Sequence, residues 1–204
     1  DNLSLPKVRI LGHILFDGCL YEKDYRYVIK YINSSKELID QFINDIKILY
    51  GLKPSSLEIE KKSYITNYKI TFVSKLLFKD LKKYFNSSSS KKNFKIPKEI
   101  MNGIKKIKIE FLRAFWEDEG SISINGRLMA DQKNEKLINQ LSKLHKEFGF
   151  SFKICKYLEH TGTMYKIYFL KNVDNLKKFN NLKLFDKSIV THGKNIGKKK
   201  ADIL

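Results

Sequence analysis

Residues 112–120 have the sequence Leu-Arg-Ala-Phe-Trp-Glu-Asp-Glu-Gly, and residues 10–18, 102 positions earlier, have the related sequence Ile-Leu-Gly-His-Ile-Leu-Phe-Asp-Gly. Each stretch predicts a helix with an acid, Asp17 or Glu119, at its C-terminal end. A carboxylate there is unfavourable for structural reasons alone, because the helix dipole already places negative charge at that end. Its occurrence at two equivalent helix ends predicts a site made of paired carboxylates.

The second stretch contains three consecutive acids, so its alignment with the first depends on the glycines. Aligning Gly120 with Gly18 pairs Glu119 with Asp17 and leaves the two acids before Glu119 as alternatives. The competing interpretation is a structural role for both paired acids. It is disfavoured because two like charges at apposed helix ends are costly without a cation.

The charge balance points to a polyanionic partner. The chain of 204 residues has 40 Lys and Arg against 22 Asp and Glu, a formal net charge of +18. Such a surface attracts nucleic acid and speeds association with it. A Lys-rich surface without a binding role is the alternative. A membrane surface is less expected, because the lysines are spread along the chain rather than gathered in one block.

Composition indicates a folded intracellular protein. Hydrophobic residues make up 42% of the chain, and no apolar run is long enough to span a bilayer. Cys19 and Cys155 form no CxxC pair, so both are expected to be reduced thiols in the cytoplasm, at the nucleoid or in an organelle. The four histidines lack metal-ligand spacing, so no zinc site is expected.

Similarity between two halves of the chain extends beyond the acidic stretches. Residues 35–42 resemble residues 134–141, and residues 68–72 resemble residues 165–169. Alternating and helical patterns around these repeats predict helix, hairpin, helix, hairpin, helix in each half. The expected fold class is therefore α+β, with two pseudo-symmetric αββαββα halves.

A Ser- and Lys-rich run separates the halves. We expect an N-terminal half over residues 1–85, a linker over 86–96 and a C-terminal half over 97–204. Within the halves, Gly51 and Gly149 are expected to end helices.

Strand alternation assigns side chains to two sheet faces. The inner face of the first half is predicted to carry Leu57, Ile59, Tyr68, Ile70 and Phe72. The opposite face would carry basic, hydroxyl and aromatic groups, which suit phosphates and base edges, although a solvated face also collects such residues. They are Tyr21, Lys23, Arg26, Lys30, Lys62, Lys69 and Thr71 in the first half, and Ser121, Ser123, Arg127, Met129, Lys153, Tyr157, Lys166 and Tyr168 in the second.

With these motifs, the chain resembles the monomeric, two-motif branch of the LAGLIDADG homing endonucleases, including archaeal intron-encoded members. The second motif, residues 112–120, carries most of the resemblance. The first motif departs from the family pattern at His13, Leu15 and Phe16. The resemblance covers nearly the whole chain and implies a saddle-shaped antiparallel sheet surface that binds double-stranded DNA.

The resemblance also implies how the acids meet. The two motif helices would pack side by side on a pseudo-twofold axis, with Gly12 and Ala114 permitting close approach. Asp17 and Glu119 would then bind Mg²⁺, or Mn²⁺, between the two scissile phosphates, assisted by the backbone carbonyls of Phe16 and Asp118. Mg²⁺ commonly takes only one or two protein carboxylates, so one acid from each half suffices.

Other polar residues are candidates for the site. Asn33 and Gln132 resemble family positions that order the attacking water, and either is alternatively a helix N-cap. Lys98 and Lys187 are suggested as basic groups by approximate position alone. The Gly197-Lys198-Lys199-Lys200 run is expected to be a solvated end that touches phosphates.

The main hypothesis is a monomeric endonuclease that cuts both strands of a long asymmetric DNA target. The second is a non-cleaving binding protein on the same scaffold, either a group I intron RNA maturase or a DNA-binding regulator. The third, an intein endonuclease domain, is disfavoured because the given chain starts with Asp1 and ends with Leu204, without the splicing nucleophile or terminal Asn.

Overall fold

The computed structural model describes residues 3–85, 94–123, 125–160 and 162–204. Its first half begins with a helix that leads directly into a hairpin, and the pattern then repeats. The elements are α1 (Leu5–Phe16), β1 (Gly18–Lys23), β2 (Arg26–Asn33), α2 (Lys36–Tyr50), β3 (Ser56–Lys61), β4 (Thr66–Val73) and α3 (Lys75–Lys82).

The second half has the same order after a short helix, α4 (Lys98–Met101). The predicted αββαββα arrangement of each half is thereby confirmed. The elements are α5 (Lys105–Glu119), β5 (Gly120–Ile122), β6 (Leu128–Gln132), α6 (Glu135–Glu147), β7 (Phe152–Glu159), β8 (Gly162–Phe169) and α7 (Val173–Asn181), followed by the 3-10 helix η2 (Lys200–Ile203).

Local sequence explains where the helices start and stop. Side-chain oxygens of serine or asparagine accept a backbone N–H at the start of α1, α2, α3, α6 and α7, which satisfies donors that have no partner within the helix. Gly51 ends α2 with φ 66°, and Gly149 follows α6 with φ 70°. Both glycines occupy the left-handed conformation that is common at helix ends, and both lie where the sequence predicted a helix to end.

Each half contains one antiparallel four-stranded sheet, in the order β1-β2-β4-β3 or β5-β6-β8-β7. The register places Lys30 between Cys19 and Thr71, and it places Tyr168 between Met129 and Lys153. The predicted outer-face residues within strands therefore do share one face of each sheet, because paired residues project to the same side. The helices cover the other face.

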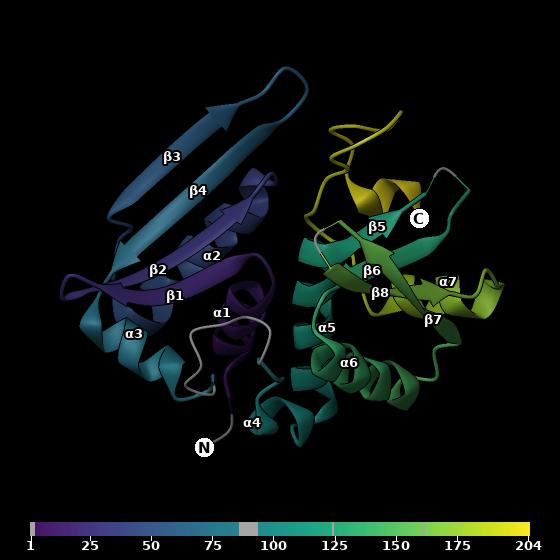
Figure 1. Ribbon diagram of the computed structural model, residues 1–204, viewed down its shortest axis with the longest axis horizontal. Helices are drawn as coiled ribbons and strands as arrows, with labels where there is room; N and C mark the ends of the chain where they lie inside the picture. Colours follow the sequence, from purple (N-terminus) through teal and green to yellow (C-terminus); the bar gives the residue numbers. More distant parts are fainter. Residues whose placement is uncertain (1–2, 86–93, 124, 161) are drawn as a thin grey trace.

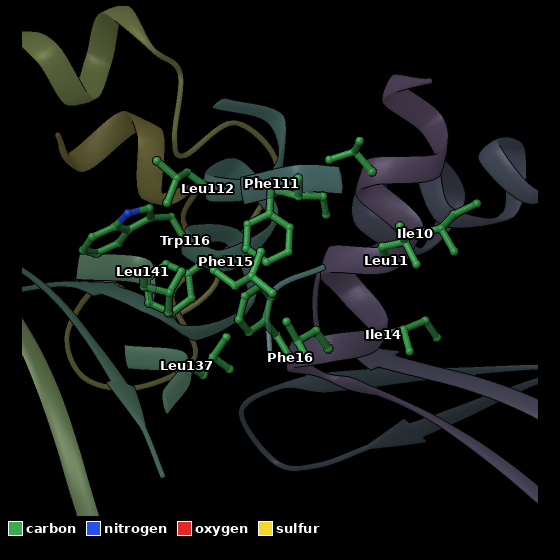
Figure 2. Packing of buried hydrophobic residues seen from close by; sticks show 14 of the residues in the cluster. Ile10, Leu11, Ile14, Phe16, Phe111, Leu112, Phe115, Trp116, Leu137 and Leu141 are labelled. Atoms are coloured by element: carbon green, nitrogen blue, oxygen red, sulfur yellow. The ribbon is translucent and has the colours of Figure 1, made fainter. Parts of the chain in front are cut away.

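Helices α1 and α5 lie side by side between the two sheets (Figure 1). A Cβ added to Gly12 would lie 2.6 Å from the Cβ of Ala114, so the two backbones approach as closely as glycine allows. Aromatic rings seal the contact: Phe16 lies 5.5 Å from Phe111 and 5.1 Å from Phe115 between ring centroids (Figure 2). This packing sets the carboxyl ends of the two helices next to each other.

Two expectations about burial are wrong. Leu57 and Ile59 do share a face with Ile70 and Tyr68, but their side chains are 46% and 55% exposed. They belong to β3, an edge strand whose residues are all exposed (Figure 1). Alternation predicts which face a residue occupies, and it does not predict whether a helix covers that part of the face.

The predicted linker is only partly described, because residues 86–93 lie outside the described residues. Its last residues do not behave as a linker. Phe94 stacks on Phe85 with ring centroids 5.4 Å apart, and Ile96 is 3% exposed. The chain therefore joins the core before α4 begins. In the described part of the chain, no helix is long and apolar enough to cross a membrane.

Candidate active site and DNA-binding face

Asp17 and Glu119 line a single pocket of about 550 Å³ at the carboxyl ends of α1 and α5. Asp17 is the residue that caps α1, and its backbone N–H donates to the carbonyl of His13 at 3.1 Å. Glu119 is the last residue of α5. The packing of the two helices thus brings the paired acids predicted from the sequence to one place.

Asn33, at the end of β2, contacts the first acid. Its Nδ2 donates to Oδ2 of Asp17 at 3.3 Å and to Oδ1 of Asp118 at 3.2 Å. Its Oδ1 accepts the backbone N–H of Ser35 at 2.9 Å. Ser35, rather than Asn33, caps α2, so the N-cap alternative for Asn33 is wrong.

Gln132 makes the corresponding contacts in the second half. Its Nε2 lies 3.5 Å from Oε1 of Glu119, at the limit of a hydrogen bond. Its Oε1 accepts the backbone N–H of Lys133 at 2.9 Å and of Asn134 at 3.3 Å. Asn134 is the N-cap of α6, so Gln132 is not the cap either. Each amide is therefore fixed by backbone on one side and directed at the acid of its own half on the other.

Asp118 is held by the other half of the molecule, which the sequence did not predict. Its side chain has no exposed surface, and it meets Nδ1 of His13 at 2.9 Å and accepts the hydroxyl of Tyr31 at 2.8 Å. Burial, with the carboxylates of Asp118 and Asp17, raises the pKa of Tyr31, which keeps its hydroxyl protonated as a donor. The signal in the sequence was two polar rings, at positions 13 and 31, among core residues.

Glu117 is also engaged elsewhere. Oε1 accepts the backbone N–H groups of Asp186 at 2.8 Å and Lys187 at 2.7 Å, and Oε2 accepts that of Ser188 at 2.8 Å. With Glu117 anchoring a distant loop and Asp118 joining the halves, the geometry favours Glu119 as the partner of Asp17. This agrees with the alignment on the glycines.

The segment after α7 forms a wall of the pocket that belongs to neither repeat. Ser188, Ile189, Val190, Thr191, His192 and Lys200 line the pocket from this segment. The Oγ of Ser35 donates to the carbonyl of Lys187 at 2.6 Å, and Lys199 pairs with Glu37 at 2.8 Å, so the segment also contacts the first half.

The expectation that the C-terminal lysine run is solvated is wrong for Lys200 and holds for Lys198, which is exposed. Lys200 is only 7% exposed, and Lys199 is engaged with Glu37. Repeat-based reasoning missed this segment because it has no counterpart in the first half.

Neither basic residue suggested from approximate position is among the described residues that line the pocket of the two acids. Lys98 starts α4, beside the N-terminus of α5, and the 15 residues of α5 place its two ends about 20 Å apart. Lys187 pairs through its side chain with Asp186. The suggestion for Lys98 is therefore wrong, and Lys187 is not among the described residues that line the pocket.

The donor set fits a small hard cation. Two carboxylates, of Asp17 and Glu119, face one pocket, and Mg²⁺ or Mn²⁺ completes its shell with water and phosphate oxygens. Across the described ranges, no group of three or more His, Cys, Asp or Glu side chains is arranged to hold a metal ion. The Oγ of Ser188, on the same pocket, is buried without a hydrogen-bond partner among the described residues.

The open face of the sheets holds most of the predicted contact residues. Lys30 lies over the ring of Tyr21 at 5.2 Å, and Lys166 lies over that of Tyr157 at 5.2 Å. Lys23 and Arg26 lie opposite each other in the register at the tip of the first hairpin. Ser121 and Lys153 lie on the open face of the second sheet.

Some predicted contact residues differ in placement or are already paired. Lys62 lies beyond the end of β3, and Ser123 and Arg127 lie in the turn between β5 and β6. Acidic partners on the open face were missed: Lys69 pairs with Glu58 at 2.6 Å, and Lys166 pairs with Asp131 at 3.3 Å.

Comparison with known proteins identifies the fold. A family model described as a LAGLIDADG-like domain matches residues 106–183, within the second half. A solved structure of mesophilic variants of the homing endonuclease I-DmoI matches with a TM-score of 0.67 and 22% identity, over 89% of this chain and 97% of that chain. The chain therefore has the two-half LAGLIDADG homing endonuclease fold, as the motifs predicted.

Two further matches bear on function. An uncharacterised protein of Methanocaldococcus jannaschii is 24% identical over 171 residues, and this chain spans 60% of its length, while the match covers 84% of this chain. Full-length DUF199/WhiA from Thermatoga maritima matches with a TM-score of 0.56 and 18% identity, over 89% of this chain and 55% of that one. Identities this low establish the fold and leave the activity open.

Proposed function

We propose that this protein is a site-specific DNA endonuclease that hydrolyses both strands of a long asymmetric target with Mg²⁺ or Mn²⁺. The observation that carries the proposal is the convergence of Asp17 and Glu119 on one pocket, at the ends of two helices packed through Gly12 and Ala114. An acid at the dipole-negative end of a helix is unfavourable, and a bound metal cation would offset two such acids on one pocket. Structures of I-DmoI, whose fold matches at a TM-score of 0.66, include its complex with DNA and Mn.

Each acid has a defined part in this proposal. The carboxylates of Asp17 and Glu119 hold the metal, and the bound metal supplies an activated water and neutralises charge on the phosphate. Asn33 and Gln132 hold the two carboxylates through their amide nitrogens. Because their amide oxygens are fixed by backbone N–H groups, both side chains are preorganised to position an acid and an ordered water.

The sheets supply the DNA-binding surface. Lys23, Arg26, Lys30, Lys69, Lys153 and Lys166, with the exposed Lys62 and Arg127 at strand ends, would contact phosphates. Tyr21, Ser121 and Ser123 would contact sugars or base edges. Because the two sheets present different side chains, the target is expected to be asymmetric. Both halves belong to one chain, so a monomer is sufficient.

The test is a cleavage selection from a random duplex library, with Mg²⁺, with Mn²⁺ and with EDTA. We expect recovery of one long asymmetric sequence cut on both strands, dependent on metal. Asp17→Asn and Glu119→Gln should each lower cleavage by at least about 100-fold and leave binding of the recovered duplex intact. Cleavage that survives both substitutions would refute the assigned site.

The second candidate is a nucleic-acid-binding protein without cleavage. The likeness to WhiA favours it, since that match shows the fold in a protein not described as an endonuclease. The same duplex library, together with a separate binding assay on a group I intron RNA, distinguishes the two candidates. A duplex or RNA that is bound with a Kd below about 100 nM and never nicked would support binding alone.

A further inference from the structure

Lys200 is a buried lysine at the carboxyl end of α5, the helix end that carries Glu119. It is 7% exposed, and its Nζ donates to the carbonyl of Gly120 at 2.6 Å and to that of Glu117 at 3.3 Å. These carbonyls belong to the dipole-negative end of the helix, where a cation is favourable. The lysine belongs to η2, so it comes from the segment outside both repeats.

The surroundings of Lys200 are acidic. The pocket is lined by Asp17, Glu117, Asp118, Glu119 and Asp131, and among the described lining residues Lys200 is the one lysine or arginine. Burial lowers the pKa of Lys200, and the first four of these carboxylates raise it. Removing water from an ammonium group is costly unless opposite charge compensates, and these acids provide that compensation.

The segment that delivers Lys200 is tied down at several points. Glu117 accepts three backbone N–H groups from residues 186–188, and Ile189 bridges to Lys199 as an isolated antiparallel pair. The backbone N–H of Lys200 donates to the carbonyl of Ser188 at 2.9 Å. The ammonium is therefore held at one place by packing and backbone bonds, independently of any ligand.

We propose that Lys200 is the built-in counter-charge of the two-acid site, and that it positions Glu119 and offsets carboxylate repulsion when no metal is bound. The metal-binding part of this inference rests on the proposed function, and the electrostatic part does not. Because its ammonium donates to two main-chain carbonyls, Lys200 is a positioning residue rather than a catalytic one. It also explains how two acids persist at apposed helix ends in a folded chain.

A double-mutant cycle without metal tests the electrostatic part. We expect Lys200→Met to lower Tm by about 6 °C, because two carbonyls lose their donor and the acids lose a cation. In the Glu119→Gln background the same change should lower Tm by about 1.5 °C less, since one of the four carboxylates around Lys200 is already neutral. Lys199→Met removes a neighbouring lysine whose ion pair is exposed and should shift Tm by less than about 1 °C.

An equal Tm loss from Lys200→Met in both backgrounds would overturn the proposal and leave only a helix-capping role. If Lys200→Met fails to fold, Lys200→Arg and Lys200→Gln replace it. The arginine variant, which keeps the charge, should retain the coupling to Glu119, and the glutamine variant, which keeps donors alone, should lose it. The reverse order would also overturn the proposal.

Titration with Mn²⁺ alone, followed by electron paramagnetic resonance, tests the metal part. Removing a nearby positive charge should tighten Mn²⁺ binding by about tenfold in Lys200→Met and leave it unchanged in Lys199→Met. Equal affinity in Lys200→Met and the parent would contradict the counter-charge. If the parent itself binds no Mn²⁺, the proposed metal site fails, and the metal-free cycle still decides the role of Lys200.

Discussion

Gly12 and Ala114 face each other across the contact between α1 and α5, and a Cβ on residue 12 would come within 2.6 Å of the Cβ of Ala114. Methyl carbons do not approach so closely, so the helices would have to separate to accommodate one. The same contact aligns the helix ends that carry Asp17 and Glu119. Stability and site geometry therefore depend on one pair of small residues.

Gly12→Ala is accordingly expected to destabilise the protein by about 1–3 kcal/mol, although alanine has the better helix propensity. The double variant Gly12→Ala with Ala114→Gly moves the methyl group to the other helix and should recover most of the loss. Urea unfolding of the two variants and the parent measures both effects. A stabilising Gly12→Ala would show that the helices can separate without penalty.

The bond network of Asp118 predicts a second effect. Asp118→Ala leaves the buried His13 ring and the Tyr31 hydroxyl without their carboxylate partner, and should cost about 3 kcal/mol. Tyr31→Phe removes one donor and should cost about 1 kcal/mol. In combination the two should cost less than their sum, because both break the same bond.

Unfolding in urea measures the three variants. Ser121→Ala, at an exposed position on the open sheet face, is the control and should change the free energy of unfolding by less than about 0.5 kcal/mol. Full additivity of the Asp118 and Tyr31 substitutions would mean that the hydroxyl bond contributes nothing.

The sequence predicted the parts of the site that depend on local pattern and on repetition. Periodicity predicted that one helix ends at Asp17 and another at Glu119, and the structure confirms this. It also predicted that Lys30 and Thr71 share a sheet face, which the strand register confirms. Coverage of a strand by helices is set by tertiary packing, so Leu57 was misjudged.

Contacts between the halves and with the C-terminal segment could not be predicted in the same way. Asp118 bonds His13 over 105 positions of sequence, and Lys200 bonds Gly120 over 80. No periodicity encodes such pairings, because they depend on how whole elements dock. A buried lysine is also counter to the expectation for a lysine-rich terminus, and only its acidic surroundings make it favourable.

His145 predicts a pH dependence of stability. Burial lowers its pKa to about 4, while Nε2 accepts the indole N–H of Trp116 at 2.9 Å. The folded state therefore resists protonation, and the unfolded state takes up a proton near pH 6.5. The contribution of His145 to the free energy of unfolding is therefore fully present above pH 6.5. It is lost as the pH falls toward 4, by about 3 kcal/mol in total.

Denaturant midpoints between pH 7.5 and 4.5 measure this dependence. His145→Gln should be less stable at pH 7.5 and should show a shallower loss on acidification than the parent. His160→Gln, on an exposed position, should follow the parent. If the denaturant midpoint fell equally steeply with pH in the parent and in His145→Gln, the loss of stability in acid would belong to carboxylates instead.

Exposed lysines on the open sheet face predict the salt dependence of DNA binding. Lys153 lies on β7 with its side chain exposed on that face, opposite Tyr168. If it neutralises one phosphate, Lys153→Ala should reduce the slope of log Kobs against log salt by about 0.9 and weaken binding to all sequences alike. Lys146, near the end of α6 on the helix-covered side, is the matched control, and Lys146→Ala should leave the slope unchanged. Equal slope changes for the two variants would mean that the bound DNA does not follow the sheet face, because a general attraction to the +18 surface makes no distinction between the sides of the molecule.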